Sequence, residues 1–296
     1  MAVNSSQLNI TDLDFENIAD NLKNYLKGQD QFKDYNFEGS SMSVLIDLLA
    51  YSSHIGAINT NIAASELFLD SAQIRKNVVS RAKDLGFVPS SESCSTAIVN
   101  LEMKQVRNAD GTSPTTTEMQ LLRGTTFVTV YDGSSYNFVV TTTKRPTQNG
   151  TSYNYNDVSI VQGTYATDSF IFDNQLANPK FVLSNERVDK GKMIVSVTSG
   201  GATETYTLST GISNITTTST VYYAQENEEG YIEIYFGDGT LGKSLLDGDV
   251  IDVTYIIVDQ DHANGASQFA LNGVVNGFTN HAVTNVSPAS GGAEKE

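Results

Sequence analysis

Apolar residues between positions 14 and 86 recur every three or four residues, which is the period of amphipathic helices. A first helix is predicted after a cap at Asp14 and before a stop signal at Gly28. Its apolar face consists of Phe15, Ile18, Leu22 and Leu26. The chain therefore begins its regular structure with a short helix that has one face to bury.

A second helix is predicted after Ser40 and Ser41, both good N-caps, with a single apolar seam about three heptads long. Leu45 and Leu49 widen this seam, so the helix is expected to bury more than one side. An ordinary core helix is one interpretation, favoured by the early end of the pattern and by Gly56 within it, and an intermolecular coiled coil is the other. The seam contains Val44, Leu48, Tyr51, Ile55, Ile58, Ile62 and Leu69, of which the first six are our candidate interface residues.

A third helix is predicted to start at Asp70 or Ser71, because Asp70 and Gln73 resemble a capping box. Gly86 closes this helix and Pro89 prevents it from continuing. Its apolar positions are Ile74, Val78, Ala82 and Leu85.

Past residue 90 the apolar period changes to two, which indicates β-strands. Alternation is clearest at residues 97–103, 195–197, 232–236 and 251–257, and turn signals such as Asp132-Gly133 separate the strands. We therefore expect an α+β protein with about three N-terminal helices and a larger, mainly antiparallel β-rich region.

Three segments are expected along the chain: a helical domain at 1–90, a Thr-rich β domain at 91–225, and a β segment at 226–296 that ends in a linker. The change of period places the first boundary, and the acidic run ENEE at 226–229 suggests the second. Residues 290–296 have the composition of a linker.

Charge and composition exclude several partners. Lys and Arg total 18 against 34 Asp and Glu, a formal net charge of -16, so the average surface repels nucleic acid. No run approaches 18 apolar residues and no secretion signal is present, so membrane insertion is not expected. The single cysteine, Cys94, cannot form an internal disulfide, which favours folding in a reducing cytoplasm or a stability that needs no disulfide.

Residues 237–244 (GDGTLGKS) have the spelling of a phosphate-binding loop, G-x-x-x-x-G-K-[ST]. A working loop of this kind opens directly into a helix whose N-terminal amides hold the phosphates. Here residues 245–249 lead into another alternating strand, so that helix has no room, and Asp238 adds negative charge. We interpret the segment as a turn between strands with the structural residues Gly237, Asp238, Gly239, Gly242 and Gly248.

Other chemistry is sparse. His54, His262 and His281 are scattered without zinc-site spacing, and the aspartates of residues 247–252 lack a calcium-binding loop. No G-x-S-x-G context marks a nucleophile. We therefore predict no catalytic residue, no metal, no cofactor and no small-molecule substrate.

Three classes of function remain. A nucleotide-dependent enzyme is supported only by the loop just described, and the other two classes are non-enzymatic. One is a structural subunit that acts through its surfaces. The other is a carbohydrate- or receptor-binding β-module, for which Tyr153 and Tyr155 could supply aromatic platforms.

Several stretches resemble a known family. Residues 32–51 (FKDYNFEGSSMSVLIDLLAY), 66–73 (ELFLDSAQ) and 85–89 (LGFVP) are similar in order and spacing to the N-terminal region of baseplate wedge subunits of T-even-like contractile-tailed phages. Residues 235–242 (YFGDGTLG) and 246–248 (LDG) resemble the related baseplate J-like proteins. The Thr-rich middle carries little of the resemblance.

The resemblance implies a structural, non-enzymatic role in a virion tail baseplate. Such subunits form dimers, join other wedge proteins, and build a sixfold ring around the tail hub that rearranges when the tail contracts. They also continue beyond the stretch that corresponds to residue 296, so this chain is expected to lack the family's C-terminal part.

Overall fold

The computed structural model describes residues 14–32, 35–37, 40–176, 179–211, 214–227 and 229–295. Residues 33–34, 38–39, 228 and 296, which belong to stretches discussed above, lie outside these ranges. The chain forms two compact units, Met1–Val88 and Pro89–Glu296. The fold is α+β, with helices in the first unit and two large, mainly antiparallel sheets in the second.

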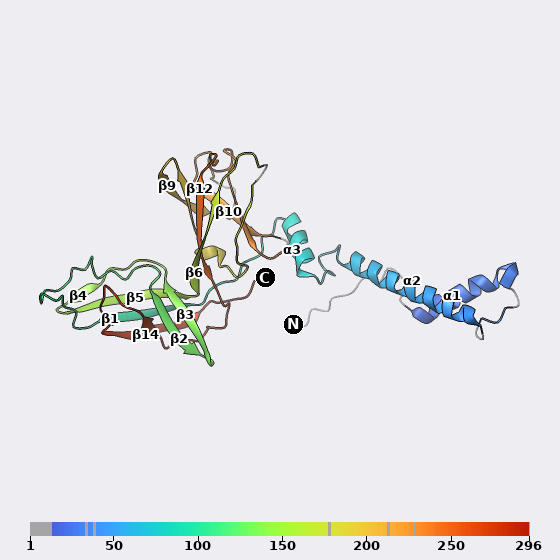
Figure 1. The fold of residues 1–296 in the computed structure, drawn as a ribbon, viewed down its shortest axis with the longest axis horizontal. Helices are drawn as coiled ribbons and strands as arrows, with labels where there is room; N and C mark the ends of the chain where they lie inside the picture. The colour runs from blue at the N-terminus through green and yellow to red at the C-terminus, as the bar shows by residue number, and fades with distance from the viewer. Residues whose placement is uncertain are drawn as a thin grey trace. The chain divides into compact units, whose positions relative to one another are not determined.

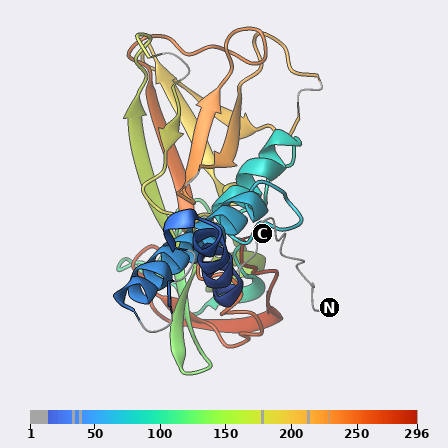
Figure 2. The ribbon, with the colours of Figure 1, turned by 90° about the vertical axis from the view of Figure 1, so that its right-hand side faces the viewer.

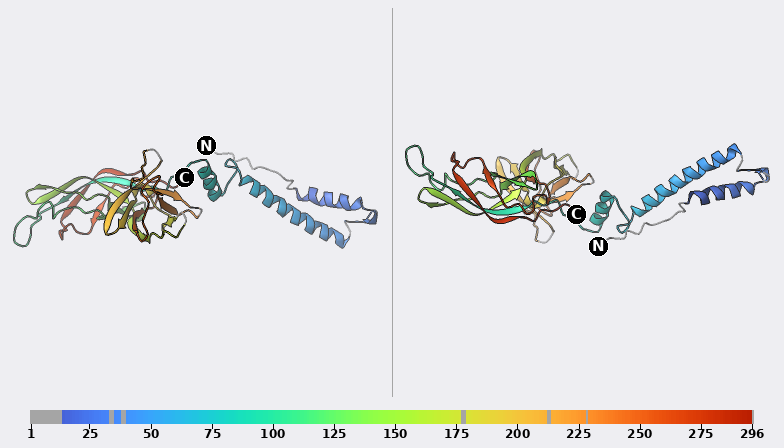
Figure 3. Two further views of the ribbon diagram at one scale, coloured as in Figure 1. Left: turned by 90° about the horizontal axis from the view of Figure 1, so that it is seen from above. Right: turned by 90° about the horizontal axis from the view of Figure 1, so that it is seen from below.

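The helical unit contains an antiparallel pair made by α1 (Phe15–Lys27) and α2 (Ser41–Ser65), with a short 3₁₀ turn, η1 (Asp30–Phe32), between them (Figures 1 and 3). The first helix begins as expected, because the Asp14 carboxylate accepts a hydrogen bond from the backbone N–H of Glu16 at 2.9 Å. The ring of Phe15 in α1 meets the ring of His54 in α2 edge-on, with centroids 6.4 Å apart. His54 is thus a packed imidazole at the contact between the two helices.

The third helix, α3, spans Arg75–Asp84 and starts later than the sequence pattern suggests. The segment before it is held from a distance: the Glu66 carboxylate accepts hydrogen bonds from the backbone of Gln73 at 3.0 Å and from the side chain of Asn77 at 2.7 Å. The predicted capping box at Asp70 and Gln73 is therefore wrong. A carboxylate that follows α2 holds the segment before α3 as a turn.

The first sheet has the strand order β13-β2-β3-β5-β1-β14, with β4 paired to β5. Every ladder in it is antiparallel. The predicted Asp132-Gly133 turn joins β2 to β3, and both residues have positive φ (49° and 77°), as a two-residue hairpin requires. The strands are β1 (Thr96–Met103), β2 (Thr126–Tyr131), β3 (Ser134–Val140), β4 (Thr147–Asn149), β5 (Ser152–Gln162), β13 (Ala270–Asn272) and β14 (His281–Ser290).

The second sheet has the order β6-β12-β8-β9-β10-β11-β7, and its only parallel ladder among the described residues joins β9 to β10. Its two ends approach each other, since the rings of Phe170 in β6 and Phe181 in β7 have centroids 5.4 Å apart. A 3₁₀ turn, η2 (Lys190–Lys192), precedes β8. The strands are β6 (Thr164–Ile171), β7 (Phe181–Val182), β8 (Ile194–Ser199), β9 (Ala202–Leu208), β10 (Val221–Glu226), β11 (Ile232–Phe236) and β12 (Val250–Ile257).

Each sheet encloses its own hydrophobic core, and the period-two alternation predicts which residues enter it. Ala97, Val99, Leu101 and Met103 of β1 are all at most 1% exposed. In the second sheet, the alternating residues of β8, β11 and β12 form the corresponding core. The sequence pattern was therefore a correct guide to the inward faces of the strands.

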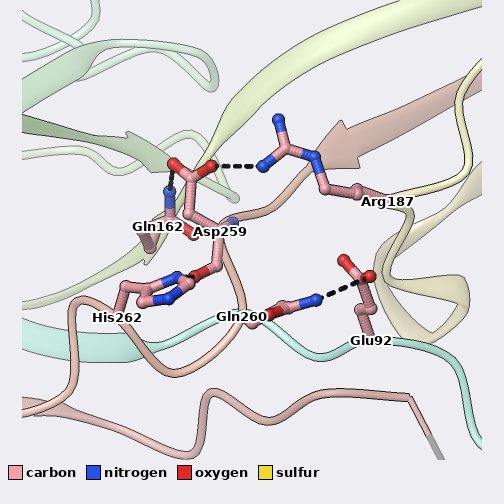
Figure 4. Close-up of polar contacts among 6 residues, drawn as sticks. All are labelled: Glu92, Gln162, Arg187, Asp259, Gln260 and His262. Atoms are coloured by element: carbon pink, nitrogen blue, oxygen red, sulfur yellow. Dashed lines mark hydrogen bonds and ion pairs between the residues drawn. The ribbon is translucent and has the colours of Figure 1, made fainter.

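The two sheets, one above the other in Figure 2, meet beside a small apolar cluster. Their junction is polar (Figure 4). The side chain of Gln162 donates to the Asp259 carboxylate and accepts from the Asp259 backbone N–H, both at 2.8 Å, while Arg187 binds the same carboxylate at 2.9 Å. Gly163 next to it has φ +127°, and a Cβ there would lie 2.3 Å from the backbone oxygen of Ile257. Only glycine fits where the chain passes from one sheet to the other.

The strand pairing divides the β unit differently from the expected segments. Residues 164–257 form the second sheet, while the first sheet combines strands from before and after them. No break occurs at residue 226, because β10 and β11 on either side of it pair directly. Residues 290–293 are not a linker: Ser290 pairs with Thr96, and Ala293 exchanges two backbone hydrogen bonds with Ser93 at 3.0 and 3.2 Å. Long-range pairing of this kind leaves no local signal in composition.

Candidate functional site

The long helix α2 buries the smaller part of its surface. Ile46 and Ala50 are at most 1% exposed, and its other buried residues are Asn61, Ala64 and Ser65. The buried side of α2 thus consists of Ile46 and four small or polar residues. Such residues allow close packing but bury little apolar area.

The large apolar residues of the predicted seam lie on the exposed side of α2. Their exposed fractions run from 38% for Ile55 to 67% for Val44, and Ile58 is half-buried. Leu45 and Leu49, next to the seam, are 54% and 57% exposed. The interpretation of the seam as the core of a single chain therefore does not hold.

The helical period explains this separation. Successive residues of an α-helix are about 100° apart, so the seam and the buried positions at 46, 50, 61 and 64 fall on different sides. Full burial of a Leu, Ile or Val side chain stabilises a protein by roughly 1.5–3 kcal/mol. The exposed seam of α2 is thus an apolar surface with a substantial gain available on contact with another surface.

By length and composition, α2 also qualifies as a helix that could cross a membrane. The core helices of soluble proteins pass the same test, and α2 carries Asp47, His54 and Asn61 within its span. The expectation of no membrane insertion stays a prediction.

The segment at 237–248 is a closed turn in the structure, and no helix follows it before β12 begins at Val250. The Asp238 carboxylate accepts hydrogen bonds from the backbone N–H groups of Thr240 and Leu241 at 2.8 and 3.1 Å, and these bonds hold its pKa below the ordinary value. A Cβ on Gly237 would lie 2.5 Å from the backbone of Gly242. The remaining predicted turn residues Gly239, Gly242 and Gly248 all have positive φ.

The amide groups that a phosphate would need are already used inside this turn. Besides the two that bind Asp238, the N–H of Gly239 donates to the carbonyl of Gly242, and those of Gly242 and Lys243 donate to carbonyls of a neighbouring loop at 3.2 and 2.8 Å. The Lys243 side chain forms an ion pair with Glu204. These contacts explain why the sequence match to a phosphate-binding loop does not correspond to such a site.

The aromatic residues proposed for carbohydrate binding are inside the first core. Tyr153 and Tyr155 are 0% exposed, and their hydroxyls donate to the backbone carbonyls of Pro114 and Met119. Burial raises the pKa of both phenols. They are structural, and the suggestion that they form a sugar-binding platform is wrong.

Within the residues that the structure describes, no three His, Cys, Asp or Glu side chains gather where they could hold a metal ion. Two aspartates at the end of this segment accept backbone hydrogen bonds instead. Asp249 accepts from the N–H of Leu246 at 2.8 Å, and Asp247 accepts from the N–H of Asn174 at 3.1 Å. Cys94 is buried beside Asp189, and desolvation together with that carboxylate raises the pKa of its thiol to about 12.

One residue that matters for the helical unit was missed by sequence reasoning. Glu66 holds the turn before α3 from seven or more residues away, so local capping patterns could not reveal it. Those hydrogen bonds, first from the Asn77 side chain and then from the Gln73 backbone, hold the pKa of Glu66 below its ordinary value.

Comparison with known proteins gives matches that follow these structural divisions. A family model described as the helical domain of gp6-like baseplate wedge protein matches residues 14–87, and one described as the third domain of bacteriophage baseplate wedge protein gp6 matches residues 166–258. Baseplate wedge protein gp6 of Enterobacteria phage T4 is 27% identical over 290 residues, which cover 92% of this chain. The chain belongs to the gp6-like baseplate wedge proteins.

The matched ranges of this gp6-like protein correspond to units of the fold. The first covers the described helices up to the boundary at Val88, and the second covers nearly all of the second sheet. The chain spans 42% of the length of the T4 relative.

Proposed function

We propose that this chain is a structural subunit of a contractile-tail baseplate wedge and that it associates with a second copy through the exposed seam of α2. The observation that carries the proposal is the seam itself. Five of its six candidate residues are at least 38% exposed, although each is a large apolar side chain, and a 3-4 spacing on one helix face is the pattern of helix–helix packing. The family match supports the baseplate as the place of assembly.

The dimer is proposed to join other wedge proteins in a sixfold ring around the tail hub, after synthesis in the host cytoplasm. A structural role without turnover is consistent with the closed turn at 237–248 and the buried Tyr153 and Tyr155. The net charge of -16 supports protein partners over nucleic acid.

The proposal is tested by the double substitution Ile55→Asp and Ile62→Asp in the full chain. Two carboxylates on the seam must be desolvated on association, so the dimer is expected to dissociate at least 100-fold more readily. Sedimentation equilibrium measures the dissociation constant, and circular dichroism checks that the helices persist.

Ser53→Asp is the matched control, because Ser53 is an exposed residue of the same helix outside the seam. It adds one carboxylate to α2, half the charge of the seam variant, and should leave the dimer intact. Unfolding of the helical unit by the seam variant would show that the seam is internal core. A wild-type chain that stays monomeric in buffer but floats with phospholipid vesicles would replace the dimer proposal with membrane contact.

A further inference from the structure

The first sheet curls until its two ends come close without pairing. In the strand order β13-β2-β3-β5-β1-β14, the terminal strands β13 and β14 lie near each other but share no ladder. β13 has only three residues, whereas β2 has six and β14 has ten. The seam between the ends is therefore closed only in part.

The loop before β13 holds one end of this opening. Ala289 of β14 accepts a hydrogen bond from the N–H of Gly265 at 2.7 Å and donates to the carbonyl of Ala266 at 2.8 Å. At the other end, Ala270 of β13 pairs with Val128 of β2. Between these two anchors the described ladders include no partner for residues 267–269.

A cleft of about 510 Å³ opens at this place. Its walls come from residues 128–130 of β2, residues 267–270, and Val283 and Asn285 of β14. None of these residues carries a charge. In a chain with 34 acidic residues, a neutral cleft favours a neutral occupant.

Two polar atoms in the cleft wall are buried and have no hydrogen-bond partner, Thr129 Oγ1 and Asn285 Oδ1. Thr129 is 3% exposed and lies on the inward face of β2, next in the alternation after Phe127. Buried polar atoms are almost always paired in folded proteins, so two unpaired ones in the same cleft indicate a missing partner.

A peptide group supplies what these atoms lack. Its N–H can donate to the Asn285 carbonyl oxygen, and its C=O can accept from the Thr129 hydroxyl. The strand directions agree: β2 and β14 are separated by four antiparallel steps and so run the same way, and a segment between them can be antiparallel to both. β14 also pairs with β1 alone among the described strands, which leaves one row of its backbone groups open apart from Ala289.

We propose that this cleft between β2 and β14 receives a short, extended and uncharged segment of a neighbouring baseplate polypeptide, which adds to the sheet edge and satisfies Thr129 and Asn285. The inference rests on the proposed role as a baseplate subunit. It assigns a second contact surface, in the β unit, that is independent of the α2 seam.

The first experiment uses phage particles assembled with this chain carrying a photoreactive benzoylphenylalanine in place of Val283, in the cleft wall. The matched control carries it at Val286 of the same strand, which is 49% exposed and is not among the cleft residues. We expect a cross-link to another chain at 283 at least fivefold stronger than at 286, mapping to an uncharged stretch. Equal cross-linking at both positions, none at 283, or a charged cross-linked stretch overturns the inference while the baseplate role stands.

A chain that is absent from purified particles removes both proposals at once. Hydrogen exchange keeps the test valid if the label disturbs assembly: amides of residues 283–287 in the unlabelled chain should exchange at least tenfold more slowly in the particle than in the free chain. Unchanged exchange there, with protection gained elsewhere in the chain, means that only water fills the cleft, which contradicts the inference.

The second experiment replaces the unpaired hydroxyl with a methyl group by Thr129→Val. The free chain should melt roughly 2–4 °C higher, because a buried unsatisfied group is removed, while incorporation into particles falls several-fold. Thr126→Val on the same strand is the control, since the Thr126 hydroxyl already donates to the Gly124 carbonyl at 3.4 Å, and it should not raise the melting temperature. A lower melting temperature for Thr129→Val, or unchanged incorporation, overturns the inference.

Discussion

The helical unit and the β unit differ in where their large apolar side chains lie. In β1, every second residue enters a core and is at most 1% exposed, whereas in α2 most large apolar residues remain on the surface and the buried ones, apart from Ile46, are small or polar. Both segments have regular apolar periodicity. Periodicity therefore identifies a face that must be covered, but it does not identify whether the same chain covers it.

This difference in burial means that the two units are stabilised by different contacts. The β unit can fold on its own contacts, since two sheets each enclose a core and a hydrogen-bonded junction ties them. For the helical unit, most of the apolar burial available to α2 comes only from contact with another surface. Under the proposed function, the β unit covers its own apolar residues and a partner covers the seam of α2.

The largest contrast is expected from the same truncation in each unit. Leu101→Ala in β1 removes a side chain that is 1% exposed and should lower the free energy of unfolding by about 2–5 kcal/mol. Leu48→Ala in α2 removes one that is 62% exposed and should change it by at most about 0.5 kcal/mol in the monomer. Urea unfolding at low protein concentration, followed by near-ultraviolet circular dichroism of the tyrosines and by the helical signal, measures both.

An equal loss from the two truncations would remove the distinction between the units. A Leu48→Ala variant that keeps monomer stability but weakens self-association would sharpen it, because the lost contact then belongs to the dimer.

Glycine substitutions should have opposite signs in the two units. Gly163→Ala at the junction places a Cβ 2.3 Å from a backbone oxygen at φ +127°, so we expect a loss of roughly 1–3 kcal/mol. Gly56→Ala in α2 meets nothing within 4 Å and should stabilise the helix by about 1 kcal/mol. Thermal melts of the two variants decide this, and a stabilised Gly163→Ala protein would contradict the tight crossing between the sheets.

The smallest effects are expected from acid. Glu66 in the helical unit and Asp238 in the β unit are carboxylates whose pKa values are lowered by hydrogen bonds in the folded state. Their contribution is complete above the ordinary values of 4.5 and 3.8 and is lost as the pH falls through the lower folded values. NMR titration should therefore show the Asn77 side-chain amide released below pH 4.5 and the Leu241 amide released below pH 3.8.

Glu66→Gln is the control for the helical unit, because it removes the titrating group while keeping an acceptor for the N–H groups before α3. The Asn77 signal should then be independent of pH across this window. A pH step that persists in Glu66→Gln would assign it to a different carboxylate.

Sequence reasoning reached the fold class and the inward faces of the strands, because both follow from local period. It also rejected the phosphate-loop interpretation of residues 237–244 for the right reason, the absence of a following helix. It failed where contacts are distant: the turn before α3 is held by Glu66, the expected boundary near residue 226 is crossed by a strand pair, and Tyr153 and Tyr155 are buried. None of these depends on neighbours in sequence.

By itself, then, the sequence determined that α2 has an apolar face and that β1 alternates, since side-chain direction follows from backbone period alone. Tertiary structure decided which faces are covered within the chain. It left the α2 seam exposed, joined strands more than a hundred residues apart in the first sheet, and brought Thr129 and Asn285 into one cleft. These outcomes depend on which distant segments meet, and no local pattern encodes that choice.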